Sequence, residues 1–168
     1  MHTQVHGYRR LQIGLHWLIA VLVLIQLVFG ESMTAYVDAV GEGRPLTSLE
    51  ATLGSVHYWV GMAVLALVIV RLGVRLYYGA PPNDVTTPRW MKLAARATHV
   101  AFYALLAAVP VSGLLAFYVW DWMGDIHAWA KPVFIVLIGI HAAAALFHQF
   151  VLKDGLLQRM LVPISDPK

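Results

Sequence analysis

Residues 126–151 of the chain read IHAWAKPVFIVLIGIHAAAALFHQFV, an apolar segment long enough to cross a lipid bilayer as one helix. Three histidines interrupt it, His127, His141 and His148, at separations of fourteen and seven residues. Because an α-helix turns by about 100° per residue, these separations place all three side chains on nearly the same side of the helix. Ionisable side chains are costly inside a membrane, so this row of histidines predicts a functional site.

The composition of the whole chain indicates a membrane protein. Of its 168 residues, 60% are hydrophobic and only 12% are charged, whereas soluble domains average about 25% charged residues. Three further apolar runs, at residues 11–30, 55–78 and 93–119, precede the fourth. We therefore predict an all-α, integral membrane four-helix bundle that forms a single domain over residues 1–168. We expect the first run to be retained as a span rather than cleaved as an export signal, and residues 31–54 to form a polar loop.

The chain contains no cysteine. This excludes disulfides, thiolate-bound iron–sulfur clusters, covalently attached c-type haem and cysteine nucleophiles. Histidine is then the main side chain able to bind a transition metal.

Lysine and arginine are distributed unequally between the two sides of the predicted bundle. Ten lie at the termini or around the connection between the second and third spans, and Arg44 and Lys131 lie on the other side. The positive-inside rule therefore predicts that both termini are cytoplasmic. The outer side carries six acidic residues, Glu31, Asp38, Glu42, Glu50, Asp121 and Asp125. Because the cations flank apolar spans and form no basic patch, we expect a lipid bilayer and no nucleic acid as partner.

This topology gives each histidine a depth in the membrane. His57 and His127 begin spans at the outer side and therefore share an outer level. Three more share an inner level: His16, His99 and His141. The inner position of His141 follows from the helical rise, which places it about 21 Å beyond His127. His148 lies about 10 Å deeper still, near the cytoplasmic surface.

Two levels of facing histidines match the requirements of two haems. Low-spin haem iron binds two imidazole nitrogens from opposite sides, and helices of a bundle supply them at matching depth. Three alternatives remain: histidines that only hydrogen-bond between helices, a zinc site, and a transporter or proton channel with a histidine relay. Zinc binds three or four converging ligands, usually with a carboxylate, and the predicted spans contain no Asp or Glu. Spacing alone does not decide whether His16 or His99 faces His141.

Arg71 lies fourteen residues after His57, the same separation as between His127 and His141. It is therefore expected at the inner level, paired with a haem propionate. Alternatively, its side chain extends to the cytoplasmic interface, as long cationic side chains do near helix ends. Gly61, one turn after His57, is expected to leave room for a porphyrin edge.

Several motifs together resemble the bacterial cytochrome b561 family. They are LQIGLHW at 11–17, VHYWVG at 56–61, TH at 98–99 with a proline eleven residues after the histidine, GIHAAAALFH at 139–148, KD at 153–154 and LQRM at 157–160. The resemblance implies a four-helix cytochrome of the bacterial inner membrane with two b-type haems. By the family's pattern, His57 and His127 bind the outer haem iron, and His16 and His141 bind the inner one. His99 then lies beside the inner haem or in a quinone site.

The resemblance also implies a reaction. The chain looks like the superoxide oxidases of this family, which take electrons from superoxide at the periplasmic face and pass them to ubiquinone near the inner haem. Lys131, one turn from His127, is then expected to attract superoxide. His148 is expected to bind ubiquinone and relay protons; alternatively, it is an interfacial histidine that binds water or a haem propionate. Trp17 and Lys153 are further candidates for the quinone site.

The acidic outer side favours a second possibility. Six acids against two cations would repel an anion such as superoxide. The chain would then be a non-catalytic electron-transfer subunit that links a periplasmic dehydrogenase or cytochrome to the quinone pool. Its Trp-rich outer loops would form the docking surface.

Overall fold

The computed structural model describes residues 7–81 and 87–163, and all its regular structure is helical. The elements are α1 (Arg10–Phe29), α2 (Glu31–Gly41), α3 (Ser48–Tyr78), α4 (Arg89–Tyr118), α5 (Met123–Phe147), the π-helical turn η1 (His148–Leu152) and the 3-10 turn η2 (Gln158–Met160). Four helices in this part of the chain are long and apolar enough to cross a membrane, namely α1, α3, α4, and α5 continued through η1. The predicted all-α fold with four long apolar helices is therefore confirmed. Lys168, one of the counted cations, lies outside the described residues.

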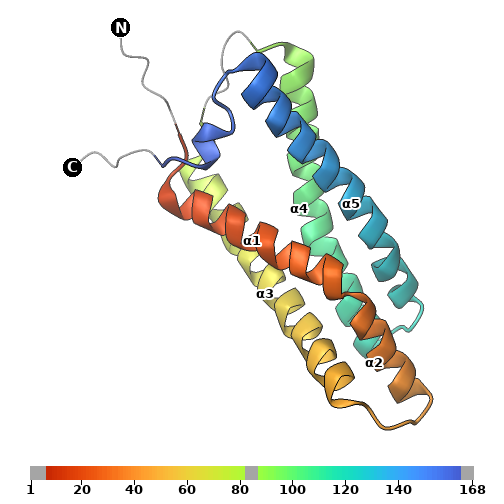
Figure 1. Ribbon diagram of the computed structural model, residues 1–168. Helices are drawn as coiled ribbons and strands as arrows, with labels where there is room; N and C mark the ends of the chain where they lie inside the picture. The colour runs from red at the N-terminus through yellow and green to blue at the C-terminus, as the bar shows by residue number, and fades with distance from the viewer. Residues whose placement is uncertain (1–6, 82–86, 164–168) are drawn as a thin grey trace, which may run out of the picture.

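The helices form two packed pairs (Figure 1). α1 packs along α3, α5 packs along α4, and the two pairs meet where α3 contacts α4. The start of α1, the end of α3, the start of α4 and the end of α5 point toward one end of the bundle, which we call the terminal end, and the two pairs spread apart there. The α2–α3 and α4–α5 connections lie at the opposite end, which we call the hairpin end. The predicted inner and outer histidine levels correspond to these two ends.

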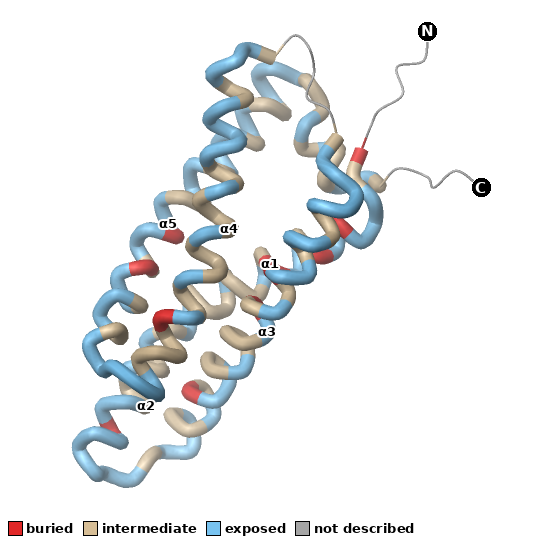
Figure 2. Tube along the Cα trace, turned by 180° about the vertical axis from the view of Figure 1, so that it is seen from behind, coloured by how far each residue is buried: buried red, intermediate tan, exposed pale blue. Residues whose placement is uncertain are grey.

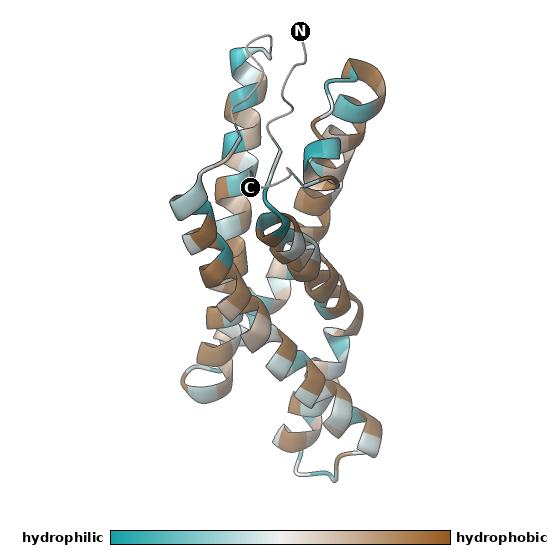
Figure 3. Ribbon diagram, turned by 90° about the vertical axis from the view of Figure 1, so that its left-hand side faces the viewer, coloured by the Kyte–Doolittle hydropathy of each residue, from teal (hydrophilic) through white to brown (hydrophobic). Residues whose placement is uncertain are grey.

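Few side chains are fully buried, as the tube in Figure 2 shows. The central cluster of buried side chains consists of Ile19, Val64 and Val68, which join α1 to α3. Many large apolar residues are instead exposed along the helices, and Figure 3 shows hydrophobic residues covering most of their middle portions. In lipid such side chains gain nothing by being buried, so a small core is what a membrane bundle requires.

The prediction of a polar loop at residues 31–54 is wrong. Eleven of these residues form α2, which starts directly after Gly30, and α3 already begins at Ser48. α2 packs on α3 through Ala39, which is completely buried, and through the ring of Tyr36. The ring lies so close to α3 that a Cβ at Gly54 would be 2.8 Å from its Cδ2.

A capping box fixes the start of α3. The Thr47 hydroxyl accepts a hydrogen bond from the Glu50 backbone N–H at 3.2 Å, and the Glu50 carboxylate accepts one from the Thr47 N–H at 2.8 Å. Arg44 also donates two hydrogen bonds to the Glu50 carboxylate. The T-x-x-E pattern at residues 47–50 was the local signal for this helix start.

Candidate metal centres

The hairpin end brings His57 of α3 and His127 of α5 together, as predicted. Their ring centroids lie 5.9 Å apart with an interplanar angle of 77°. Two imidazoles bound to opposite sides of one metal ion, with nitrogen–metal bonds of about 2 Å, have centroids about 6 Å apart. The spacing therefore fits a shared axial-ligand pair, although an ordinary edge-to-face contact of two rings covers the same range.

The hydrogen bonds of these two rings differ. Nδ1 of His57 is buried and has no hydrogen-bond partner among the described residues. Buried polar atoms are nearly always paired, so the unpaired Nδ1 of His57 is a candidate to contact a bound group. Nδ1 of His127 lies 2.8 Å from the backbone carbonyl oxygen of Val109. Donation of Nδ1–H to that oxygen orients the ring and leaves Nε2 as the ligand nitrogen.

Gly113 of α4 makes room for the His127 ring. A Cβ at this position would lie 2.9 Å from Cε1 and 3.0 Å from Nδ1 of the imidazole. The ring therefore packs directly against the backbone of α4, a contact that only glycine permits. Sequence reasoning did not identify Gly113, although a signal existed. It lies fourteen residues after His99, the separation that relates the two histidine levels on α5.

Gly61 of α3 lies against a side chain of α1. The side-chain amide of Gln26 occupies the space beside it, so a Cβ at Gly61 would lie 3.1 Å from Gln26 Nε2. The same amide donates a hydrogen bond of 2.8 Å to the backbone carbonyl of His57. Gly61 thus accommodates a contact between α1 and α3, and the expectation that it leaves room for a porphyrin edge stays a prediction.

The terminal end brings three histidines together, His16 of α1, His99 of α4 and His141 of α5. The ring centroids of His16 and His141 lie 6.3 Å apart, and those of His99 and His141 lie 5.8 Å apart. Both distances suit a shared metal ion, so the rings alone leave the partner of His141 open. Nδ1 of His99 lies 2.6 Å from the Ala95 carbonyl oxygen of its own helix. Among the described residues no three His, Asp or Glu side chains form a group that could hold a metal ion.

Arg71 lies at the terminal end, as its spacing from His57 predicted. Its Nη1 donates a hydrogen bond of 2.8 Å to the backbone carbonyl of Gln12 in the first turn of α1. The Gln12 amide in turn donates to the carbonyl of Gly79 at 2.9 Å. A guanidinium has five N–H donors, so this one can bind an anionic group while it remains anchored to α1.

Lys131 lies at the hairpin end and is paired with a carboxylate. Its Nζ donates a hydrogen bond of 2.6 Å to Oε1 of Glu31, which joins α5 to the start of α2. This hydrogen bond and the lysine charge lower the pKa of Glu31. The positive charge predicted to attract an anion is therefore partly balanced by a neighbouring negative one.

Trp17 and His148 each contact the segment that follows the π-helical turn η1. The indole Nε1 of Trp17 donates to the carbonyl of Met160 at 2.9 Å, and His148 Nδ1 lies 2.5 Å from Oδ2 of Asp154. The sequence predicted Trp17 and His148 as site residues, but it did not predict the residues that they contact, Met160 and Asp154. Lys153 lines a cavity of about 270 Å³ together with four other residues, Gln149, Phe150, Gly155 and Gln158. Trp17 and His148 are not part of its lining.

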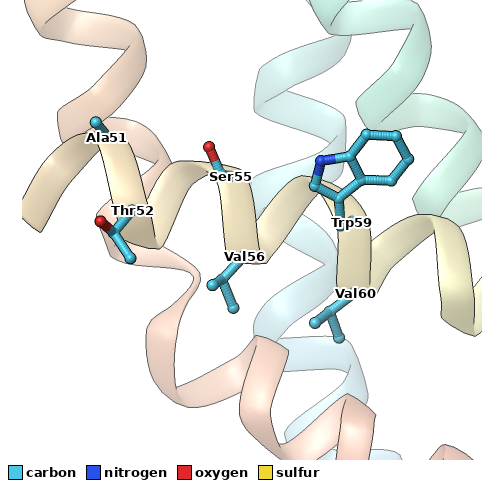
Figure 4. Close-up of a pocket in the computed structure, with 6 residues that line it drawn as sticks. All are labelled: Ala51, Thr52, Ser55, Val56, Trp59 and Val60. Atoms are coloured by element: carbon cyan, nitrogen blue, oxygen red, sulfur yellow. The ribbon is translucent and has the colours of Figure 1, made fainter.

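A larger hollow lies elsewhere, on the first half of α3. It is a groove of about 580 Å³ lined by Ala51, Thr52, Ser55, Val56, Trp59 and Val60, whose side chains Figure 4 shows. His57 does not line this groove. Successive residues of a helix point about 100° apart, so the groove lies on a different face of α3 from the metal-binding candidate.

Comparisons with known proteins cover nearly the whole chain. The model of the family described as prokaryotic cytochrome b561 matches residues 7–163. "Cytochrome b562" of Cereibacter sphaeroides is 43% identical over 165 residues, which span 96% of this chain and 99% of that protein. "Probable superoxide oxidase CybB" of Yersinia pestis is 30% identical over 176 residues, or 92% of this chain and 95% of that protein. "Cytochrome b561 homolog 1" of Escherichia coli is 28% identical, with 92% and 96% covered.

Proposed function

The chain belongs to the prokaryotic cytochrome b561 family, and we propose that it binds two b-type haems and conducts electrons across the membrane to a quinone. The family membership makes it a membrane electron carrier of the b-type cytochromes. Haem would supply reversible one-electron transfer at each of the two histidine levels.

His57 and His127 would hold the haem at the hairpin end, and His16 and His141 the haem at the terminal end. The observation that carries this proposal is the spacing of the two pairs, 5.9 Å and 6.3 Å between ring centroids. The choice of His16 over His99 rests on the resemblance of residues 11–17 to the family, since the ring distances do not separate them. Arg71 would bind a propionate at the terminal end, and His99 would lie beside that haem.

We place the terminal end in the cytoplasm of a bacterial cell, with both termini inside. Among the described residues, the terminal end carries Arg9, Arg10, Arg71, Arg75, Arg89, Lys92, Arg96, Lys153 and Arg159. The hairpin end carries Arg44 and Lys131. The positive-inside rule favours this orientation. It can be tested with a reporter enzyme that is active only inside the cell, fused to the C-terminus.

The reaction that we propose is oxidation of superoxide at the hairpin end coupled to reduction of ubiquinone at the terminal end. Two superoxide anions each lose one electron to become dioxygen, and ubiquinone takes up those two electrons and two protons. The similarity to a protein named probable superoxide oxidase supports this assignment. Lys131 would attract the anion, and His148 would contact the quinone, with Trp17 and Lys153 as further candidates for the quinone site.

A second function is favoured by the charges at the hairpin end. Glu31 pairs with Lys131, and further acids nearby make this face unattractive to an anion. The chain would then be an electron-transfer subunit that accepts electrons from a soluble dehydrogenase or cytochrome. The relative at 43% identity carries a name that specifies no substrate.

A single experiment separates these two functions. The purified, oxidised protein is mixed with a pulse of superoxide, and haem reduction is followed by absorption. The first function predicts rapid reduction, abolished by superoxide dismutase and followed by reoxidation when ubiquinone is present. Haems that stay oxidised would favour the second function, and a protein without reduced b-type bands would contradict both.

A further inference from the structure

The chain reverses direction immediately after α5. The last helical turns widen into the π-helical turn η1, and Lys153 then adopts a left-handed conformation with φ of 53°, followed by Gly155 with φ of 71°. π-Helical turns are rare and occur often at functional sites. The reversal brings Asp154 back to the side chain of His148, the first residue of the turn.

Both oxygens of the Asp154 carboxylate are held. Oδ2 lies 2.5 Å from Nδ1 of His148, and Oδ1 accepts a hydrogen bond of 3.0 Å from the Leu156 backbone N–H. The Asp154 N–H also donates to the carbonyl of His148 at 3.4 Å. The side chains of His148 and Asp154 are only 15% and 22% exposed, so little water competes for their contact. The ring of His148 is therefore fixed by its neighbour across the turn.

A carboxylate bound to one imidazole nitrogen determines what the other nitrogen can do. When Nδ1–H donates to Asp154, Nε2 is the nitrogen that remains to exchange protons with a ligand. Asp154 and His148 thus form a dyad able to hold a proton and release it from Nε2.

The position of the dyad suits a proton transfer that accompanies electron transfer. His148 lies seven residues after His141, so it is about 10 Å further along the same helix than a proposed haem ligand. The segment after the dyad continues to η2, where the carbonyl of Met160 holds the Trp17 indole of α1. The reversed segment therefore lies across the terminal end from α5 to α1.

We propose that Asp154 is the positioning residue that makes His148 a proton donor for quinone reduction. This inference rests on the proposed quinone reduction at the terminal end. A quinone becomes a quinol by gaining two electrons and two protons. His148 delivers one proton from Nε2 to the nearer carbonyl oxygen and is reprotonated from cytoplasmic water, while the other carbonyl oxygen takes its proton from water directly.

The variant Asp154→Asn tests the proposal with little change of shape. Asparagine keeps an oxygen for the Leu156 N–H, but its NH₂ donates to Nδ1 of His148 and so reverses which ring nitrogen carries the proton. The matched control is Asp38→Asn, which removes a carboxylate from α2 at the other end of the protein. Chemically reduced protein is mixed in a stopped-flow instrument with a water-soluble ubiquinone analogue, and separately with ferricyanide, which accepts electrons without protons.

We expect Asp154→Asn to keep both haems and to slow reoxidation at saturating quinone at least about tenfold, because general acids typically contribute 10²–10⁴-fold. The half-saturating quinone concentration and the ferricyanide rate should stay within about threefold of the wild type. The double variant His148→Gln/Asp154→Asn should be no slower than His148→Gln, since residues that act through one another are not additive.

Three outcomes would overturn the inference: an unchanged quinone rate, an equal loss with ferricyanide, or a double variant slower than His148→Gln. If instead the wild-type haems are not oxidised by quinone at all, the proposed function itself fails. The two failures are therefore distinguishable in the same experiment.

Discussion

The imidazole of His127 on α5 lies directly against the backbone of Gly113 on α4, where a Cβ would come within 2.9 Å of the ring. The ring is held there by the Val109 carbonyl at 2.8 Å. The side chain at position 113 therefore determines how the imidazole of His127, a proposed haem ligand, is oriented.

The variant Gly113→Ala should lose the haem at the hairpin end and keep the other, so that haem content per chain falls to about half. The added methyl group pushes the His127 ring away from the Val109 carbonyl, and small misplacements of a metal ligand weaken binding strongly. Pyridine haemochrome spectra measure the content. Gly73→Ala is the control, because a Cβ at Gly73 meets nothing within 4 Å. Two haems in Gly113→Ala would contradict the close contact.

Replacing His57 or His127 with alanine should also remove the hairpin-end haem alone. The two rings belong to one pair and lie far from the histidines of the terminal end. A redox titration should then show one b-type transition in place of two. Loss of both haems, or of neither, would show that the pairing is wrong.

His16 and His99 can be distinguished by the same approach. We expect His16→Ala to lose the terminal-end haem and His99→Ala to retain it with a shifted midpoint potential. The opposite result would assign His99, whose ring lies 5.8 Å from that of His141, as the ligand. The near-infrared charge-transfer band of the oxidised protein reports whether the remaining iron has two imidazole ligands.

Glu31→Gln should accelerate haem reduction by superoxide a few-fold at low ionic strength. Removing the carboxylate leaves the Lys131 charge unbalanced, and an anion is attracted more strongly. The acceleration should vanish at high salt, because the Debye length falls to about 3 Å at an ionic strength of about 1 M and the charge of Lys131 is then screened. Asp38→Asn removes the same charge without freeing a cation. If both variants react alike, local pairing of Lys131 is irrelevant to the rate.

The four long helices could be predicted because each follows from a local property, a long and predominantly apolar run. The grouping of the histidines into two levels along the helices was equally accessible, because helical rise and rotation are constant. α2 was missed because its charges were read as a loop, although Met33, Tyr36 and Val40 have helical spacing.

Contacts between helices could not be derived in this way. The approach of Gly113 to His127 depends on how α4 crosses α5. The pairing of His148 with Asp154 depends on a chain reversal that no periodic pattern in the sequence predicts. The pairing of Lys131 with Glu31 likewise joins residues 100 positions apart. These are the features in which the structure changed the chemical interpretation.

The division of the bundle into an α1–α3 pair and an α4–α5 pair has a consequence for biogenesis. Each proposed ligand pair takes one histidine from α5 and the other from α1 or α3, so each haem would connect the two helix pairs. Beyond the contact of α3 with α4 few buried side chains join them. Insertion of the spans and maturation of the protein would then be separate events, the second limited by the supply of haem in the cell.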